Sequence, residues 1–326
     1  RFGPLHTDDG TVFRLWAPAA RSVAVEVDGR PHPLTHVGEG WYRSEVPAVE
    51  RGTPYRFRIN DEVSVPDPAS RMQKSDVHGS SVLREPTGPA DPPRRSVTWE
   101  ETVLYELHTG TFTREGTFAA AAEQLERLQD LGVTTIELMP VADFPGDPNW
   151  GYDGLLPLAP DRAYGSPDDL VALISAAHRR DLAVVLDVVY NHFGPEGNYL
   201  HLYAPQFFSD AIDTPWGPGI DFTRPEVRRF FIENAVYWLA DFGFDGLRLD
   251  AVHAIDDPSV DNGGTHFLNE LATTLRDAVP EGRTPHLILE NDRNQARFLK
   301  ESDDQRDRFE AQWNDDVHHA FHVLLT

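Results

Sequence analysis

The chain has 326 residues, of which 40% are hydrophobic and 25% charged, with a formal net charge of -24 and no cysteine. This length allows one large domain or two ordinary ones around a sizeable core. The acidic balance argues against nucleic acid as a partner, because phosphate binding needs clustered Lys and Arg. The absence of cysteine excludes disulfides and thiol chemistry and favours a reducing compartment. Without an apolar run of bilayer length or a signal-like start, we predict a soluble cytoplasmic protein with no membrane partner.

The first 90 residues show short stretches of alternating apolar and polar residues between Gly, Pro and Asp turns. Examples are "TVFRLWAP" (11–18), "SVAVEVDGR" (22–30) and "PYRFRIN" (54–60). Alternation with period two is typical of half-buried strands, so residues 1–90 are predicted to form a small β-sandwich. Proline and glycine recur in the polar stretch "REPTGPADPPRRS". This composition predicts a linker at 91–98.

From residue 99 onward, apolar strand-like runs alternate with helical stretches. The runs are "VLYELH" (103), "TTIELMPV" (134), "AVVLDVVY" (183), "FDGLRLD" (244) and "HLILEND" (286). Between them, residues 117–132 bring Leu125, Leu128 and Leu131 to one helical face, and Ser166 with Pro167 opens a second helix. Such repeats predict an α/β fold, either a (β/α)8-type barrel or a doubly wound sheet. We favour the barrel, because no Gly-x-Gly-x-x-Gly motif follows the first strand.

The predicted barrel is incomplete in this chain. Only five strand runs follow the linker, or six with "FEAQW" (309–313), whereas a closed barrel of this type needs eight. We therefore expect residues 99–326 to be the N-terminal part of the barrel, and the 326 residues alone to be inactive and poorly soluble, because an open sheet leaves an unpaired edge.

Polar residues gather where three of the runs end. They are Asp187, Asn191 and His192 after the third run, Asp250 and His253 after the fourth, and Glu290, Asn291 and Asp292 after the fifth. Parallel strands end on one face of a barrel, which carries the active site. We therefore expect these side chains to converge.

Arg248 and Asp250 are two residues apart in a strand run, so their side chains share one face. Taken alone, the pair is either a structural ion pair or a prepared nucleophile. Converging carboxylates and imidazoles suit metal-assisted hydrolysis or glycoside hydrolysis. The guanidinium of Arg248 would compete with a metal ion but would keep a nucleophile ionised, which favours glycoside hydrolysis without metal or cofactor. Glu290 follows the apolar run "LIL", a setting that suits a protonated general acid.

The motifs "DVVYNH", "GLRLDAVH" and "LILEND" resemble, in order, the first three signature regions of the α-amylase family of glycoside hydrolases. The resemblance implies that Asp250 is the nucleophile, Glu290 is the acid/base, and His192 and Arg248 hold the reacting sugar and the nucleophile. It also implies that Tyr152 stacks on that sugar and that the sandwich is a glucan-associated module. The further positions that it marks as substrate-binding are Leu249, Ala251, Val252, His253, Asn314, Asp315, Asp316, Val317 and His318.

Three longer stretches, at 149–170, 190–208 and 312–326, are most similar to family members that release trehalose from the end of a malto-oligosyltrehalose. This resemblance implies an α-glucan substrate and a metabolic coupling to a malto-oligosyltrehalose synthase. Branching or debranching activity, a non-catalytic glucan-binding role and a metal-dependent hydrolase remain alternatives. By composition, "WNDDVHH" is also a candidate metal site or a set of helix caps. The family's third catalytic carboxylate is expected beyond Thr326.

Overall fold

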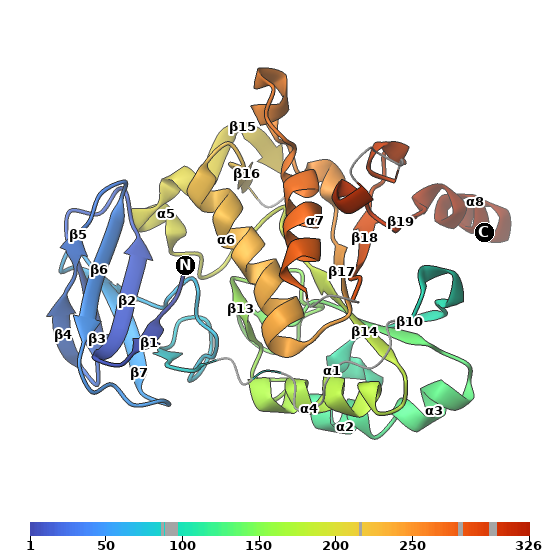
Figure 1. Cartoon of the computed structure of the whole chain (residues 1–326), viewed down its shortest axis with the longest axis horizontal. Coiled ribbons are helices and arrows are strands. Elements are labelled where there is room, and N and C mark those ends of the chain that lie inside the picture. The colour runs from blue at the N-terminus through green and yellow to red at the C-terminus, as the bar shows by residue number, and fades with distance from the viewer. Residues whose placement is uncertain (86–87, 89–96, 215–216, 280–282, 300–304) are drawn as a thin grey trace.

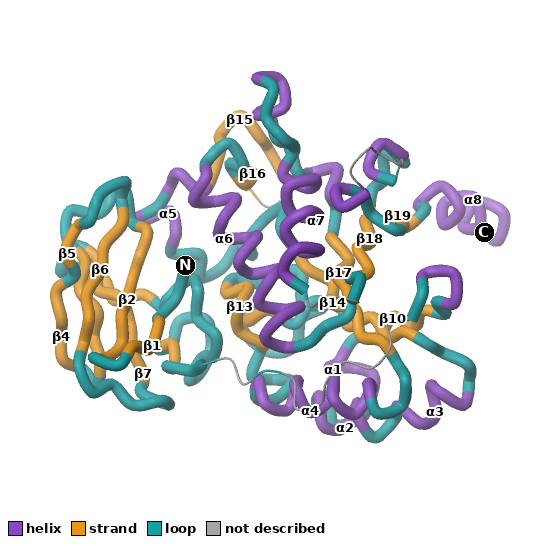
Figure 2. Tube along the Cα trace, in the orientation of Figure 1, coloured by secondary structure: helices purple, strands orange, loops and turns teal. Residues whose placement is uncertain are grey.

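The computed structural model describes residues 1–85, 88, 97–214, 217–279, 283–299 and 305–326 (Figure 1). Most of the predicted linker at 91–98 therefore lies outside the described residues. Two units stand side by side, an N-terminal pair of antiparallel sheets and a larger α/β unit (Figure 2). Among the helices of the described ranges, none is both long enough and apolar enough to span a lipid bilayer.

The N-terminal unit consists of two antiparallel sheets, with strand orders β1-β2-β6-β5 and β4-β3-β7-β8, and β9 pairs with β7. Its strands are β1 (Leu5–Thr7), β2 (Gly10–Trp16), β3 (Val23–Val27), β4 (Arg30–Pro33), β5 (Thr35–His36), β6 (Trp41–Val46), β7 (Pro54–Ile59), β8 (Val63–Val65) and β9 (Ser81–Val82). Buried residues alternate with less buried ones along β7, as expected for a sheet with one face on the core. This is the sandwich that the sequence predicted.

Aromatic contacts hold the sandwich together and attach it to the α/β unit. Phe13 of one sheet meets Tyr55 of the other with ring centroids 5.1 Å apart. The ring of Phe2 lies 5.0 Å from that of Phe230, in the α/β unit, and the Phe2 backbone N–H donates to the carboxylate of Glu233 at 2.7 Å. The buried residues of the two units therefore form one continuous core.

The α/β unit is built on a curled, six-stranded sheet with the order β10-β11-β14-β17-β18-β19 and parallel pairing throughout. The strands are β10 (Leu104–Leu107), β11 (Thr135–Leu138), β14 (Ala183–Val188), β17 (Gly246–Leu249), β18 (His286–Glu290) and β19 (Ala311–Trp313). All six residues of β14 are buried, because a parallel strand is covered on both faces. The five predicted strand runs and the sixth at 309–313 are thus confirmed.

Helices lie between consecutive strands of this sheet from β10 to β18, as in other parallel α/β folds, and one further helix follows β19. They are α1 (Thr109–Phe112), α2 (Phe118–Ala122), α3 (Leu125–Asp130), α4 (Pro167–His178), α5 (Leu200–Tyr203), α6 (Pro225–Val236), α7 (Phe267–Ala278) and α8 (Asp315–Leu325), and a π-helical turn at Tyr237–Phe242 continues α6. Short 3-10 turns lie at Trp99–Glu101, Pro205–Phe207, Val252–Ala254, Pro258–Asn262, Ala296–Phe298 and Gln305–Asp307.

The two helices predicted from the sequence agree with the structure to different degrees. Ser166 caps α4 and Pro167 lies in its first turn, as predicted, and Asp169 completes a capping box with Ser166. The stretch 117–132 is instead two helices, α2 and α3. Leu125 and Leu128 are buried, whereas Leu131 is 70% exposed, so only two of the three leucines assigned to one helical face lie in the core. Leu131 is the C-cap residue of α3, which ends at Asp130.

The strands β12 (Ala142–Asp143) and β13 (Leu156–Pro160) pair in an antiparallel manner and carry a loop between them. A similar antiparallel pair is formed by β15 (Phe208–Thr214) and β16 (Gly217–Ile220). The β12–β13 loop includes Tyr152. At the base of this loop, the buried carboxylate of Asp161 accepts hydrogen bonds from the backbone of Phe144 and Ala163 at 3.1 and 2.7 Å.

A second buried acid lies at the same base and gives a pH-dependent prediction. Burial, together with the nearby charges of Asp161 and Asp76, raises the pKa of Asp143 to about 9. The unfolded chain loses this proton near pH 4, so this carboxyl's contribution to stability is fully present below about pH 4 and is lost as the pH rises to about 9. We expect Asp143→Asn to gain at least about 2 kcal/mol in free energy of unfolding over the parent at pH 8, and little at pH 4.

Urea unfolding of both proteins at the two pH values measures this difference. The exposed Asp130 provides the matched control, because Asp130→Asn makes the same substitution at a position in contact with solvent. Equal gains at pH 4 and pH 8 would contradict the prediction.

Candidate active site

The polar residues that the sequence placed at three strand ends do converge at one edge of the parallel sheet. Asp187 near the end of β14 is paired in register with Arg248 of β17, and Leu249 pairs with Leu289, so Asp250 and Glu290 follow at the same level. Arg248 is flanked by a strand on each side, because β17 lies between β14 and β18. The carboxyl ends of parallel strands thus bring these groups together.

The guanidinium of Arg248 is the centre of the site. Its Nη1 lies 2.7 Å from Asp187 Oδ2 and 3.0 Å from Asp250 Oδ1, and its Nη2 lies 3.1 Å from Glu290 Oε2. Arg248 is only 7% exposed. Burial opposes its charge, but Asp187, Glu290 and Asp250 outweigh burial and raise the pKa of Arg248. The guanidinium is therefore a permanent cation shared by three carboxylates.

Asp250 is held at both carboxylate oxygens. Arg248 contacts Oδ1, and the side-chain amide of Asn191 donates to Oδ2 at 2.8 Å and to the Asp250 backbone carbonyl at 2.9 Å. The Nδ1 atom of His192 hydrogen-bonds in turn with the amide oxygen of Asn191. The sequence placed Asn191 among the polar residues at the strand ends, but only the structure shows that its side chain positions Asp250.

Glu290 has a more polar setting than its apolar run suggested. Its Oε2 accepts a hydrogen bond from the backbone N–H of Ala251 at 2.8 Å and also contacts Arg248. Ala251 has φ 43° and ψ 49°, in the left-handed region, and this turn directs its N–H toward Glu290. The expectation of an apolar environment is therefore corrected, because neighbouring strands supply donors that the local sequence does not reveal.

Tyr152 and His192 border the site from the side of the β12–β13 loop. The Tyr152 hydroxyl donates to Asp187 Oδ2 at 2.9 Å, and His192 Nε2 lies 2.9 Å from the Tyr152 carbonyl oxygen. Burial raises the pKa of Tyr152, lowers the pKa of His192, and raises the pKa of Asp187 to about 7. Tyr152 therefore remains a hydroxyl near neutral pH.

The remaining predicted positions near β17 differ in accessibility. Leu249 and Val252 are buried, with 0% and 4% of their surface exposed, so their side chains lie in the core rather than at an open surface. Ala251 is half-buried. His253 is partly exposed, and its Nδ1 lies 3.2 Å from Asp292 Oδ1 at the rim of the site.

The five predicted positions in "WNDDVHH" lie one strand further along the sheet. Trp313 pairs in register with Glu290, so Asn314 follows at the same edge and caps α8 by accepting from the Val317 N–H at 3.1 Å. Helix α8 then projects away from the sheet (Figure 1). Asp315 is half-buried, and Asp316 and His318 are exposed. Among the described residues, the ion pairs of Arg248 involve Asp187, Asp250 and Glu290 and none of these three side chains.

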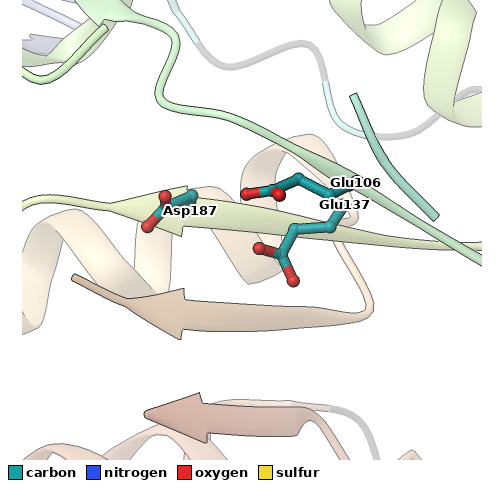
Figure 3. Close-up of side chains that lie close together, drawn as sticks. All are labelled: Glu106, Glu137 and Asp187. Carbon is teal, nitrogen blue, oxygen red and sulfur yellow. The ribbon is translucent and has the colours of Figure 1, made fainter. Parts of the chain in front are cut away.

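Two acids that the sequence reasoning missed lie on the same sheet. Glu106 of β10 and Glu137 of β11 are register partners, and one oxygen from each lies within 4.8 Å of the other and of an Asp187 oxygen (Figure 3). The signal was the single acid within each of the apolar runs "VLYELH" and "TTIELMPV". Asp187 thus belongs both to the Arg248 cluster and to this three-carboxylate group.

Comparison with known proteins defines the class. Residues 1–74 match the family model described as carbohydrate-binding module 48 (isoamylase N-terminal domain). Residues 69–211 match the alpha amylase catalytic domain. With a sandwich, a curled parallel sheet and acids at its strand ends, the chain belongs to the α-amylase family.

Several individual proteins are similar to the chain over nearly its whole length. The chain is 44% identical to malto-oligosyltrehalose trehalohydrolase of Deinococcus radiodurans over 99% of the chain and 52% of that protein. It is 41% identical to the protein of the same name from Saccharolobus solfataricus, over 100% of the chain and 57% of that protein. A crystal structure of a putative alpha amylase from Salmonella typhimurium matches with a TM-score of 0.92 and 46% identity, covering 99% of the chain and 55% of that structure. The chain spans about half the length of the curated relatives it matches.

The Arg248 cluster predicts a large loss of stability when the cation is removed. Arg248→Met would leave three carboxylates without their shared partner, and we expect it to lower the free energy of unfolding by about 3–5 kcal/mol at pH 7. The loss should shrink as the pH falls, because protonated carboxyls need no counter-charge. Arg229→Met is the control, since Arg229 is 51% exposed and forms a surface pair with Glu233.

Urea unfolding at pH 7 and pH 5 measures both variants. For Arg229→Met we expect a change of at most about 0.5 kcal/mol. Similar small losses in the two variants would contradict the central place of Arg248.

Proposed function

We propose that this protein is a retaining α-glucan hydrolase that cleaves the α-1,4 bond next to the trehalose end of a malto-oligosyltrehalose and releases trehalose. The observation that carries the proposal is the single guanidinium that contacts both Asp250 and Glu290 at the ends of neighbouring strands. Support for the substrate comes from two relatives, 44% and 41% identical over nearly the whole chain, that are named malto-oligosyltrehalose trehalohydrolase.

In the proposed reaction, Asp250 attacks the anomeric carbon and Glu290 protonates the departing oxygen. Glu290 then removes a proton from water, which hydrolyses the glycosyl-enzyme. Retention requires the two carboxyl groups to be about 5–5.5 Å apart. Adjacent strands and a shared guanidinium favour such closeness. Asn191 and Arg248 would fix both oxygens of Asp250, which reduces the motion needed for attack.

The residues around this pair are proposed to hold the sugar. We assign stacking to Tyr152, whose ring is fixed by its hydrogen bond to Asp187, and hydroxyl binding to His192 and His253. Residues 314–318, at the end of the adjoining strand, remain proposed substrate contacts. For Leu249, Ala251 and Val252 we propose that the backbone, and not the side chain, borders the bound sugar. No metal ion is assigned a part in bond cleavage.

At the level of the whole protein, we propose a glucan-associated sandwich at 1–90, a linker at 91–98 and a catalytic barrel portion at 99–326. The match of residues 1–74 to a carbohydrate-binding module supports the first assignment. A cytoplasmic location, supported by the absence of cysteine, and a metabolic coupling to a malto-oligosyltrehalose synthase complete the proposal.

Incubation of the natural full-length protein with a malto-oligosyltrehalose tests the function directly. We expect chromatography to resolve free trehalose, and Asp250→Asn to abolish its release while leaving the unfolding midpoint nearly unchanged. Glucan chains with new branch points in place of trehalose would indicate a branching enzyme. Binding without turnover in both proteins would indicate a glucan-binding role.

The role of Glu290 gives a separate prediction. Glu290→Gln cannot donate a proton, so kcat should fall by about 100-fold or more on a malto-oligosyltrehalose. With an α-glucosyl fluoride, whose leaving group needs little protonation, the glycosylation step should lose much less. Burst kinetics on the fluoride separates this step from the later hydrolysis. An equal loss of the first step on both substrates would remove Glu290 from the acid role.

A further inference from the structure

A short turn of residues 74–80 lies between the sandwich strands β8 and β9 in the chain. The backbone N–H of Lys74 donates to the Ser80 carbonyl at 2.9 Å and closes the ends of this turn. Within it, the Gly79 N–H donates to the Asp76 carbonyl at 2.6 Å. The backbone of the 74–80 turn therefore fixes its own conformation, and its side chains are presented from a rigid support.

The 74–80 turn contacts two loops of the α/β unit. In the β12–β13 loop, the backbone N–H of Gly146 donates to Asp76 Oδ2 at 3.2 Å. In the loop that follows β14, the Tyr199 hydroxyl shares a hydrogen bond with His78 Nδ1, 2.8 Å away. The two rings also meet edge to face, with their centroids 5.9 Å apart. One turn of the N-terminal unit thus binds both loops.

Gly197, in the loop that follows β14, lies where the turn and both loops meet. A Cβ atom at this position would be 3.0 Å from His78 Cε1 and 3.1 Å from both Val77 Cγ2 and Leu155 Cδ1. Val77 and Leu155 are buried, so neither side chain can move away freely. Gly197 also has φ 90°, a conformation that other residues rarely adopt. The three segments are therefore packed closely enough that only glycine fits between them.

The two loops hold the groups that border the proposed site. Tyr152 belongs to the β12–β13 loop, and His192 lies shortly before Gly194, whose backbone N–H donates to the Gly154 carbonyl at 3.1 Å. A Cβ atom at Gly194 would be only 2.1 Å from the carbonyl oxygen of Asp153. The loops are thus in direct contact beside Tyr152, whose carbonyl oxygen lies 2.9 Å from His192 Nε2. A displacement of either loop would move both side chains.

We propose that His78 is a positioning residue for the sugar-binding loops. Through Tyr199 it holds the loop that follows β14 against the 74–80 turn, while Asp76 holds the β12–β13 loop on the same turn. The N-terminal unit thereby keeps the two loops in the arrangement that binds the sugar, although His78 itself does not contact the substrate. The effect on sugar binding rests on the proposed function, whereas the attachment of the loops to the turn does not.

Hydrogen–deuterium exchange of the natural full-length protein tests the attachment. His78→Ala should increase local opening of residues 193–203 by about three- to tenfold, the effect of losing one hydrogen bond, and of 144–155 by less. Tyr199→Phe removes the hydroxyl alone and should give a similar increase. The double variant should add little, because both changes remove the same hydrogen bond. His78→Asn keeps a hydrogen-bonding group near the position of Nδ1 and should remain closer to the parent.

His36→Ala is the matched control for this measurement. His36 is an exposed histidine of β5 that also meets a tyrosine ring edge to face, with its centroid 5.1 Å from that of Tyr42, but the contact lies within the sandwich. We expect this variant to leave exchange in both loops of the α/β unit unchanged.

Kinetics of the full-length protein on a malto-oligosyltrehalose tests the consequence for the site. Loops that are open for part of the time leave only a fraction of the molecules ready to bind, so His78→Ala should raise KM by about twofold. The value of kcat should change little, because saturating substrate keeps the loops closed. A merely structural role would lower the amount of active enzyme, and therefore kcat, at an unchanged KM.

Two results would overturn the proposal. One is unchanged exchange of both loops in His78→Ala and Tyr199→Phe, which would show that the turn does not hold them. The other is a KM equal to that of the parent in His78→Ala, in a protein that releases trehalose, which would leave His78 without a part in substrate binding. A parent that releases no trehalose would instead contradict the proposed function, and the exchange measurement would still decide whether the turn holds the loops.

Discussion

The buried guanidinium of Arg248 is the interaction on which the arrangement of the site depends. Its two terminal nitrogens contact acids from the strand on each side of β17 and one that follows β17 itself. Removing charges from water is costly, and this cost is offset only if all of the groups keep their positions. The strand order β14-β17-β18 therefore sets the positions of the acids, and the acids in turn require this strand order.

Hydrogen bonds extend this constraint from the strands to the loops. Asn191 holds Asp250, His192 holds Asn191, and the Tyr152 carbonyl holds His192, while the Tyr152 hydroxyl returns to Asp187. The β12–β13 loop is thus tied to the same acids as Arg248. A site built in this way is fixed before any ligand arrives, because each side chain has its orientation set by another.

The sandwich extends the same core rather than standing apart from it. Phe2 bridges Trp41 of the sandwich and Phe230 of α6, and α6 precedes the strand that carries Arg248. Backbone contacts add to this attachment, since the Ala19 N–H donates to the Tyr203 carbonyl at 2.9 Å. The alignments with the two relatives cover both units, so these relatives are similar to the sandwich and to the α/β unit together.

The sequence by itself determined the secondary-structure elements that depend on local patterns, and it identified the acidic residues at the strand ends. Period-two alternation and buried β-branched runs depend on neighbours in the chain, which is why the sandwich, the six parallel strands and the cap at Ser166 were predictable. The convergence of Asp250 and Glu290 was predictable because the carboxyl ends of parallel strands lie at the same edge of a sheet. The pairing of Arg248 with Asp250 followed from their spacing in one strand. The tertiary structure alone decided that Arg248 and Ala251 also contact Glu290 and that Asn191 contacts Asp250, because these contacts cross strands and loops at separations that no local pattern encodes. It also brought Glu106 and Glu137 to Asp187, since register between distant strands, and not sequence spacing, decides which buried acids face each other.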